Sequence, residues 1–321
     1  MKTGNFATII MSELYKQLKD YGHVKINEPL AKHTTFKIGG RASFFIEVKE
    51  NDSLVKLLNF LSENGIEYYI LGGGSNILFS DDDFEGVVIK ISNFKFQISN
   101  CLIEADAGVV LGKIVNEAIK NELAGLEWGA GIPGTVGGAV RGNAGAMGKD
   151  ISLILEKVEV WENGEVVKYG KDDCKFEYRG SKFKKDGGII LRAWFKLEKG
   201  DKAEILKTVQ GYLKQRSGRY PAFPSAGSFF QNLDLKNWPG DKKDLLPIFI
   251  ERKKIPAGWL IEQCGLKGFS IGGAKVSEEH GNFIINFDHA SQSDILQVVE
   301  AVKEKVYNKY GVALVPEVEI I

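Results

Sequence analysis

The chain of 321 residues exceeds one average domain, so two or three packed units are expected. Its 42 Lys and Arg residues equal its 42 Asp and Glu residues, so no global field favours nucleic acid or an anionic membrane. An anionic ligand must therefore be held by local groups. The 37 glycines indicate many tight turns or close backbone approaches.

The cysteines and the apolar runs exclude several classes. Cys101, Cys174 and Cys264 are far apart and lack CxxC or Cys/His spacing, so neither a disulfide framework nor a metal site is expected. No apolar run approaches the ~20 residues of a membrane helix. The N-terminus also lacks the basic-then-apolar pattern of a signal peptide. We expect a cytoplasmic protein without membrane insertion.

The first part of the chain alternates between strand and helix patterns. Residues 34–40 (TTFKIGG) and 42–49 (ASFFIEVK) have strand character, and 52–65 has apolar residues at helical spacing with a glycine stop. EYYI before the Gly72–Gly74 run and GVVIKIS after it are also predicted strands. A glycine loop between two strands of a small α/β unit is therefore expected.

The middle of the chain predicts a hairpin at 94–109 and a helix at 111–123, followed by the glycine-dense segment 128–148. Strands are predicted at 155–161, 165–170 and 188–198, and a helix at 203–216 leads into the last part. There we expect a buried strand in GNFIINF, an amphipathic helix after Ser291 or Ser293, and an extended tail.

Two glycine-rich loops are the first candidates for a binding site. Residues 72–76 (GGGSN) can turn several peptide N–H groups toward one anion. They match neither a GxGxxG motif that opens a helix nor a GK[ST] loop, and a tight interstrand turn is an open alternative. The second loop, GIPGTVGGAVRGNAG at 131–145, could clamp a dinucleotide together with the first. The neighbouring polar groups, those of Ser75, Asn76, Thr135 and Asn143, suit a flavin or nicotinamide dinucleotide.

The order of seven motifs resembles the UDP-N-acetylenolpyruvoylglucosamine reductase family. These motifs are HTTFKIGG, LGGGSNIL, GIPGTVGGAVRGNAG, YRGSKF, PSAGSFFQN, AGWLIEQCGLKG and a terminal PEVEI, and they run from His33 to Val318. The resemblance implies an α+β fold: a two-subdomain FAD-binding module of the vanillyl-alcohol-oxidase type plus a third α/β substrate domain. The expected domains are 12–92 with the tail 314–321, then 93–206, then 207–313. No insertion for an extra substrate-covering tyrosine is evident, so the chain resembles the form that lacks this loop.

The resemblance also implies a reaction and its cofactors. NADPH would reduce non-covalent FAD, which passes hydride to the enolpyruvyl group of UDP-N-acetylglucosamine enolpyruvate and gives UDP-N-acetylmuramate for peptidoglycan. The FAD contacts would come from Thr34 and Thr35, from the first loop and from the second. The implied loop residues are Gly72, Gly73, Gly74, Ser75, Asn76, Ile77, Gly131, Ile132, Pro133, Gly134, Thr135, Gly137, Gly138, Asn143, Ala144 and Gly145.

Three residues are implied to be catalytic. Arg179 in YRGSKF would stabilise negative charge at the substrate carboxylate, because a guanidinium fork matches a carboxylate at two points. Ser228 in PSAGSFFQN would donate a proton, and Glu317 in PEVEI, rather than Glu319, would act with the arginine. Without the motifs, these residues have ordinary interpretations as a surface arginine, a loop serine and a solvated glutamate.

The remaining assignments concern the substrate. Asn232 matches a diphosphate contact, and Arg219 or Arg216 is a candidate basic partner. Tyr178, Gln263 and Lys275 are candidates because they lie near motifs. Two other interpretations remain open: another FAD-dependent oxidoreductase of the same fold that acts on a sugar or alcohol, and a nucleotide-binding regulatory protein without turnover. We expect a monomer that acts on a small molecule and has no nucleic-acid partner.

Overall fold

The computed structural model describes residues 12–218 and 220–321. The chain divides into two compact units. Among the described residues, the first unit comprises 12–28, Arg41–Gly73 and Phe84–Lys214, and the second comprises Pro29–Gly40, Gly74–Asp83, 215–218 and 220–321. Across the described residues, no helix has the length and apolar character needed to span a bilayer. The predicted three-domain division stays a prediction.

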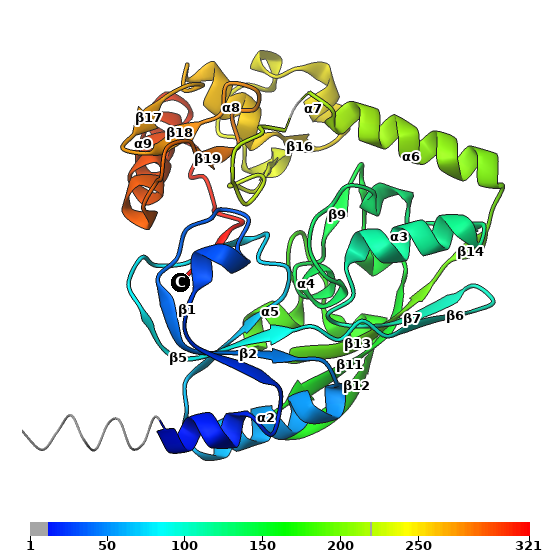
Figure 1. The fold of residues 1–321 in the computed structure, drawn as a ribbon. Coiled ribbons are helices and arrows are strands. Elements are labelled where there is room, and N and C mark those ends of the chain that lie inside the picture. Colours follow the sequence, from blue (N-terminus) through cyan, green and yellow to red (C-terminus); the bar gives the residue numbers. More distant parts are fainter. Residues whose placement is uncertain (1–11, 219) are drawn as a thin grey trace, which may run out of the picture. The chain divides into compact units, whose positions relative to one another are not determined.

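A four-stranded sheet in the first unit carries the first glycine loop at the end of one strand (Figure 1). Strand β5 (Phe84–Ile91) is mostly apolar. Its residues Val87, Val88 and Ile89 are fully buried, as expected for a strand covered on both faces. Both neighbours of β5 in the sheet, β2 and β3, pair with it in parallel. In spatial order the strands are β1 (His23–Pro29), β2 (Arg41–Val48), β5 (Phe84–Ile91) and β3 (Tyr68–Leu71).

Helix α2 (Asn51–Glu63) connects β2 to β3 and confirms the predicted helical periodicity. It buries Leu54, Leu57, Leu58 and Leu61, which lie on one face of a helix. Because the crossover returns the chain to the same sheet, the residues after Leu71 begin at the end of a strand held by its parallel neighbour.

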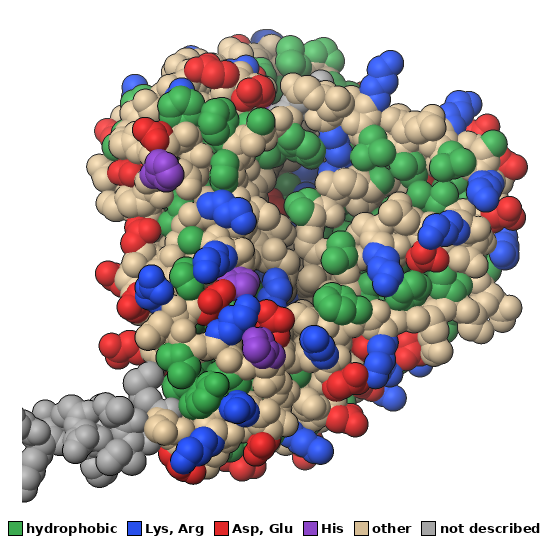
Figure 2. All heavy atoms as spheres, in the orientation of Figure 1, with side chains coloured by type: hydrophobic (Ala, Val, Ile, Leu, Met, Phe, Trp, Pro, Cys, Tyr) green, Lys and Arg blue, Asp and Glu red, His purple; other side chains and the backbone are tan. Residues whose placement is uncertain are grey.

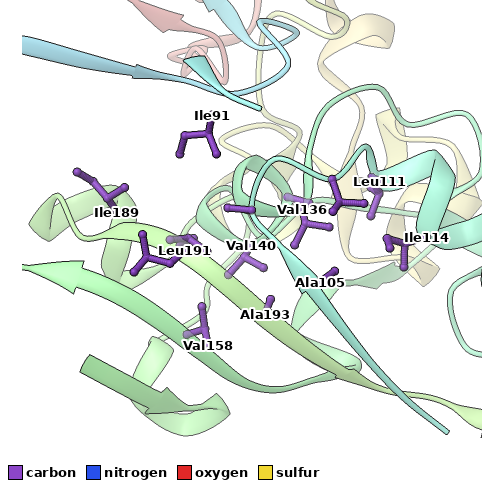
Figure 3. Close-up of a cluster of buried hydrophobic side chains, with 14 of the residues drawn as sticks. Ile91, Ala105, Leu111, Ile114, Val136, Val140, Val158, Ile189, Leu191 and Ala193 are labelled. Carbon is purple, nitrogen blue, oxygen red and sulfur yellow. The ribbon is translucent and has the colours of Figure 1, made fainter. Parts of the chain in front are cut away.

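A five-stranded antiparallel sheet forms the second layer of the first unit. Helix α3 (Leu111–Lys120) and the short helix α4 (Val136–Arg141) pack beside it, and Figure 3 shows Val136 and Val140 of α4 among Leu191 and Ala193 of the sheet. This packing anchors the second glycine loop to the core. In spatial order the strands are β12 (Glu165–Gly170), β11 (Leu155–Glu162), β13 (Ile189–Lys196), β7 (Leu102–Asp106) and β6 (Phe96–Ser99).

The second unit contains a three-stranded sheet packed against helix α9 (Gln292–Tyr310). Of the two predicted N-cap candidates, Ser291 is the cap and forms a capping box with Asp294. The hydrogen bond from the Ser291 backbone lowers the pKa of Asp294. The strands of this sheet are β17 (Ser270–Ile271), β18 (Ala274–Val276) and β19 (Ile284–Asn286).

Shorter elements complete both units. In the first unit they are β8 (Leu123–Ala124), β9 (Gly145–Ala146), β10 (Lys149–Asp150), α5 (Lys182–Asp186), β14 (Glu198–Lys199) and α6 (Lys202–Arg216), whose last two residues belong to the second unit. In the second unit they are β4 (Ile77–Leu78), β15 (Leu233–Asp234), α7 (Pro247–Glu251), β16 (Lys254–Ile255), α8 (Ala257–Gln263) and β20 (Glu319–Ile320). Short 3-10 helices are η1 (Leu30–His33), η2 (Glu127–Gly129), η3 (Ile151–Leu153), η4 (Lys171–Cys174), η5 (Leu235–Asn237) and η6 (Lys242–Asp244).

Two expectations from the sequence are wrong. Residues 34–40 are not a strand, because the backbone turns at Thr34, whose hydroxyl donates to the Ile38 carbonyl at 3.2 Å, and Lys37 has a φ of 59°. The second glycine-rich segment is not a continuous loop either. It contains helix α4, because Thr135 caps that helix and accepts a hydrogen bond from the Gly138 N–H.

The charge pattern agrees with the equal counts of acidic and basic residues. Figure 2 shows both signs interspersed on the face in view, without a field of one sign. Binding of an anion must therefore depend on particular loops and side chains.

We predict that Ser291→Ala lowers the free energy of unfolding by about 1 kcal/mol, because it removes the oxygen that accepts the Asp294 N–H at 3.0 Å. The measurement is the midpoint of urea unfolding at pH 7. Ser293→Ala, at an exposed position in the first turn, is the matched control and should change the midpoint much less. Equal losses in the two variants would contradict the cap.

Candidate active site

The first glycine loop begins where β3 ends and lies against the second loop within the first unit. A Cβ on Gly73 would lie 2.7 Å from the Gly134 Cα, and one on Gly72 would lie 2.9 Å from the Thr135 hydroxyl. No side chain fits in either place. Gly73 is therefore required by the close approach of two backbones, and Gly72 by the approach of the Thr135 side chain.

The second half of the same loop, from Gly74 onward, belongs to the second unit and is held by other residues of that unit. A Cβ on Gly74 would lie 2.0 Å from the His33 carbonyl, and Gly74 has a φ of 66°. The Gly74 carbonyl accepts the Thr35 N–H at 2.9 Å. Thr34 and Thr35 therefore shape the loop: the Thr34 hydroxyl is used in its own turn, and the Thr35 hydroxyl also donates to Gly74.

The peptide N–H groups of this loop fit an anionic group. Among the described residues, those of Gly73, Gly74, Ser75 and Asn76 donate to no protein acceptor. Successive N–H groups around a residue in left-handed conformation, here Gly74, form a concavity that suits phosphate oxygens. The donor set therefore fits the diphosphate of a dinucleotide.

Lys90 is a strand residue that contacts the first glycine loop and was not predicted from the sequence. It lies on β5 in register with Leu71, the last residue of β3, and its ammonium group donates to the Gly72 carbonyl. Burial lowers the pKa of Lys90, and nearby Glu47 opposes this shift. The only sequence signal is a lysine in the otherwise apolar run VVIKI. Its contact with Gly72 becomes visible only when the strand register is known.

The second glycine loop is joined to the turn that carries Arg179. The Asn143 amide donates to the Glu177 carbonyl at 2.9 Å, and its oxygen accepts the Ser152 N–H at 3.1 Å. Arg179 donates from Nη2 to the Gly145 carbonyl at 2.8 Å. The structure therefore brings together three predicted residues of the first unit, and it uses the Asn143 side chain for contacts within the protein.

The backbone at Arg179 is in an unusual conformation. Glu177 and Gly180 exchange two backbone hydrogen bonds, at 3.0 and 3.1 Å, which makes Tyr178 and Arg179 the central residues of a tight turn. Arg179 has a φ of 59°, a region that glycine or asparagine usually occupies in such a turn. Strain of this kind persists only where surrounding contacts hold the residue, and it is common at functional sites.

Ser228 and Glu317 lie on neighbouring backbone segments of the second unit. The Glu317 N–H donates at 2.8 Å to the carbonyl of Phe229, the residue after Ser228. Ser228 itself forms a β-bridge with Phe283. The Asn76 side chain donates to the Glu317 carbonyl at 3.1 Å, so the glycine loop and the C-terminal segment are tied together at this point.

The candidate substrate residues have different surroundings. In the second unit, Asn232 accepts the Ala257 N–H at the start of α8, and the Lys275 ammonium lies 3.6 Å from the centre of the Phe287 ring. Gln263 is exposed at the end of α8. In the first unit, Tyr178 lies beside the Arg179 guanidinium. Arg219 lies outside the described residues.

The chain matches two family models. Residues 42–170 match an FAD binding domain, and residues 219–321 match the C-terminal domain of UDP-N-acetylenolpyruvoylglucosamine reductase. The first match lies within the predicted FAD-binding part of the chain, 12–206, and includes both glycine-rich loops. It confirms the expected α+β fold with an FAD-binding module and a further domain.

Relatives and a solved structure match over nearly the whole chain. The UDP-N-acetylenolpyruvoylglucosamine reductase of Caldanaerobacter subterraneus subsp. tengcongensis is 41% identical over 98% of this chain and 99% of its own. That of Anoxybacillus flavithermus is 39% identical over 97% of this chain and 99% of its own. The crystal structure of the reductase from Thermus caldophilus has a TM-score of 0.75 and 33% identity, and covers 93% of this chain and 98% of its own. The chain therefore belongs to the UDP-N-acetylenolpyruvoylglucosamine reductase family.

Proposed function

We propose that this chain reduces UDP-N-acetylglucosamine enolpyruvate to UDP-N-acetylmuramate in peptidoglycan synthesis, with Arg179, Ser228 and Glu317 as its catalytic residues. Bound FAD supplies the chemistry by taking hydride from NADPH and passing it to the enolpyruvyl group. The observation that carries the proposal is the match over nearly the whole chain, which includes the reductase's C-terminal domain at 219–321. A sugar or alcohol oxidase of the same fold is not favoured, because such an enzyme does not need that domain.

The two glycine-rich loops are proposed to hold the FAD diphosphate and its neighbouring groups. The N–H groups of Gly73, Gly74, Ser75 and Asn76 are the proposed donors, because no protein acceptor in the described chain uses them. Lys90 adds a positive charge at the base of this loop. An ammonium that is partly buried interacts with a diphosphate more strongly than one in water, because the local dielectric is lower.

Arg179 is proposed to bind the substrate carboxylate. Hydride addition to the enolpyruvyl double bond places negative charge on the adjacent carbon and on that carboxylate. A guanidinium cannot lose its proton and donates two parallel hydrogen bonds, so it stabilises this charge as it develops. The Arg179 side chain already has a fixed direction, because one nitrogen donates to the Gly145 carbonyl.

Ser228 is proposed to deliver the proton that completes the reduction, with Glu317 beside the developing charge. A serine hydroxyl is a weak acid and needs a polarised position to act as a donor. The hydrogen bond from Glu317 N–H to the Phe229 carbonyl supports this pairing, because it places the two residues on adjoining segments. Asn232, Lys275, Tyr178, Gln263 and Arg219 are the proposed substrate contacts.

The domain boundaries, the oligomeric state and the location in the cell are also proposals. Three domains, at 12–92 with 314–321, at 93–206 and at 207–313, would separate cofactor binding from substrate binding. A monomeric cytoplasmic enzyme without a nucleic-acid partner fits the small-molecule substrate and the balanced charge.

The first experiment tests the activity itself. The purified protein should be yellow, NADPH should bleach the flavin absorbance, and UDP-N-acetylglucosamine enolpyruvate should restore it. The absorbance near the flavin maximum is recorded anaerobically after each addition. A colourless protein that does not take up FAD, or a flavin that the substrate does not reoxidise, would contradict the proposal.

Ser228→Ala should separate the two half-reactions. Reduction of the flavin by NADPH should stay near the wild-type rate, whereas reoxidation by substrate should slow by about 100-fold, because a proton donor is lost. Stopped-flow absorbance measures both rates. Ser270→Ala, an exposed serine of the same unit, is the matched control and should change neither. Equal slowing of both half-reactions would indicate a structural role for Ser228.

Arg179→Lys should slow reoxidation by substrate almost as much as Arg179→Ala, by about 100-fold, since the ammonium cannot reproduce the two-point geometry. The same change at the exposed Arg252 is the control and should have no effect. A lysine variant that reoxidises at close to the wild-type rate would remove Arg179 from the catalytic set.

A further inference from the structure

Three side-chain hydrogen bonds join the Arg179 turn to the second glycine-rich segment. The Ser181 hydroxyl donates to the Arg141 carbonyl at 2.7 Å, and the Asn143 amide donates to the Glu177 carbonyl at 2.9 Å. The third bond runs from Arg179 to the Gly145 carbonyl at 2.8 Å. We call this arrangement the turn clamp. It places alternate residues of the turn, at 177, 179 and 181, against alternate residues of the segment 141–145.

The two outer members of the turn clamp are buried polar groups. Ser181 has no exposed surface and Asn143 is 3% exposed. Breaking the hydrogen bond of a buried polar group leaves that group unsatisfied and lowers the stability of the folded state. These two bonds are therefore strongly favoured. Ser181 precedes helix α5, yet its hydroxyl makes no capping bond to that helix. The bond to Arg141 is therefore what the hydroxyl does in this structure.

The middle of the turn clamp is strained, and its outer members can hold it. Arg179 has a positive φ of 59°. This conformation costs on the order of 1 kcal/mol for a residue with a long side chain and must be offset by neighbouring contacts. The segment opposite the turn is confined too, because a Cβ on Gly145 would lie 2.5 Å from the Lys149 carbonyl. The Arg179 side chain thus projects from a turn that is held by hydrogen bonds before it, at Glu177, and after it, at Ser181.

We propose that Ser181 and Asn143 are positioning residues for Arg179. They hold the Glu177–Gly180 turn against residues 141–145 and so present the guanidinium in one orientation. The inference rests on the proposed catalytic role of Arg179. It also gives Asn143 a task within the protein, because both ends of its amide make hydrogen bonds there, while its implied FAD contact stays a prediction.

Ser181→Ala is the principal test, because it removes one oxygen and leaves the helix cap unchanged. Reoxidation of the flavin by substrate should slow by about 10-fold, since a small misplacement of a charge-stabilising group is enough to do so. Reduction by NADPH and the dissociation constant for FAD should change by less than about 2-fold. Ser181→Thr keeps the hydroxyl and should restore most of the rate. Ser92→Ala, at a buried serine of the same unit that takes no part in the turn clamp, is the matched control.

Hydrogen exchange provides a readout that does not depend on chemistry. The Gly180 amide donates to the Glu177 carbonyl within the turn, so the peptide that spans it should exchange faster in Ser181→Ala than in Ser92→Ala. Asn143→Asp is a second variant that replaces the donor to Glu177 with an acceptor and should act in the same direction. Faster exchange with unchanged reoxidation in both variants would overturn the positioning role.

A double-mutant cycle separates this inference from the function on which it rests. In an Arg179→Ala background, Ser181→Ala should cause no further slowing of reoxidation, because the group it positions is absent. A full additional 10-fold loss in that background would overturn the inference while leaving the role of Arg179 intact. If Arg179→Ala alone reoxidises normally, then the proposed role of Arg179 fails first.

Discussion

The close approach of two glycine backbones is the constraint on which the site in the first unit depends. Gly73 and Gly134 leave no room for a side chain, since a Cβ on Gly73 would lie 2.7 Å from the opposite Cα. The peptide N–H groups of Gly73 and of the three residues that follow it donate to no protein acceptor in the described chain. The parallel pairing of β3 with β5 holds the start of this loop, and the packing of α4 on the five-stranded sheet holds its partner. A loose loop would have to be ordered again each time that a ligand binds, and this would weaken binding.

In the second unit, backbone hydrogen bonds hold together the two segments that carry Ser228 and Glu317. Ser228 and Glu317 are far apart in the sequence, yet the bond from Glu317 N–H to the Phe229 carbonyl joins their segments at 2.8 Å. Asn282 adds to this, because its side chain both accepts from the Phe230 N–H and donates to the Phe230 carbonyl. Such a buried pair of bonds fixes a segment more tightly than one bond can. The backbone at Ser228 and Glu317, two half-buried residues proposed to be catalytic, therefore has a defined position.

The sequence predicted the regular elements well and the special turns poorly. Helices α2 and α9 were predicted correctly because burial of one face enforces a helical period, and strand β5 because a short continuous apolar run is typical of a fully buried strand. Helix α4 was missed because its six residues are too few to show a period and two of them are glycines. The segment at 34–40 looked extended, but a turn at Thr34 and a positive φ at Lys37 are decided by local contacts. Lys90 was missed because its partner, Gly72, depends on strand register.

The same limit applies to the candidate site and explains the case of Asn143. A motif shows which residue types stand in a row, but it does not show which way each side chain turns. An asparagine amide can donate and accept at the same time, so it serves equally well at a ligand or inside a protein. In this chain the amide of Asn143 spans Glu177 and Ser152, and its buried position leaves it committed to both. The strained Arg179 then follows physically: a positive φ at a residue with a long side chain persists only if a neighbouring segment holds the turn, and residues 141–145 are that segment.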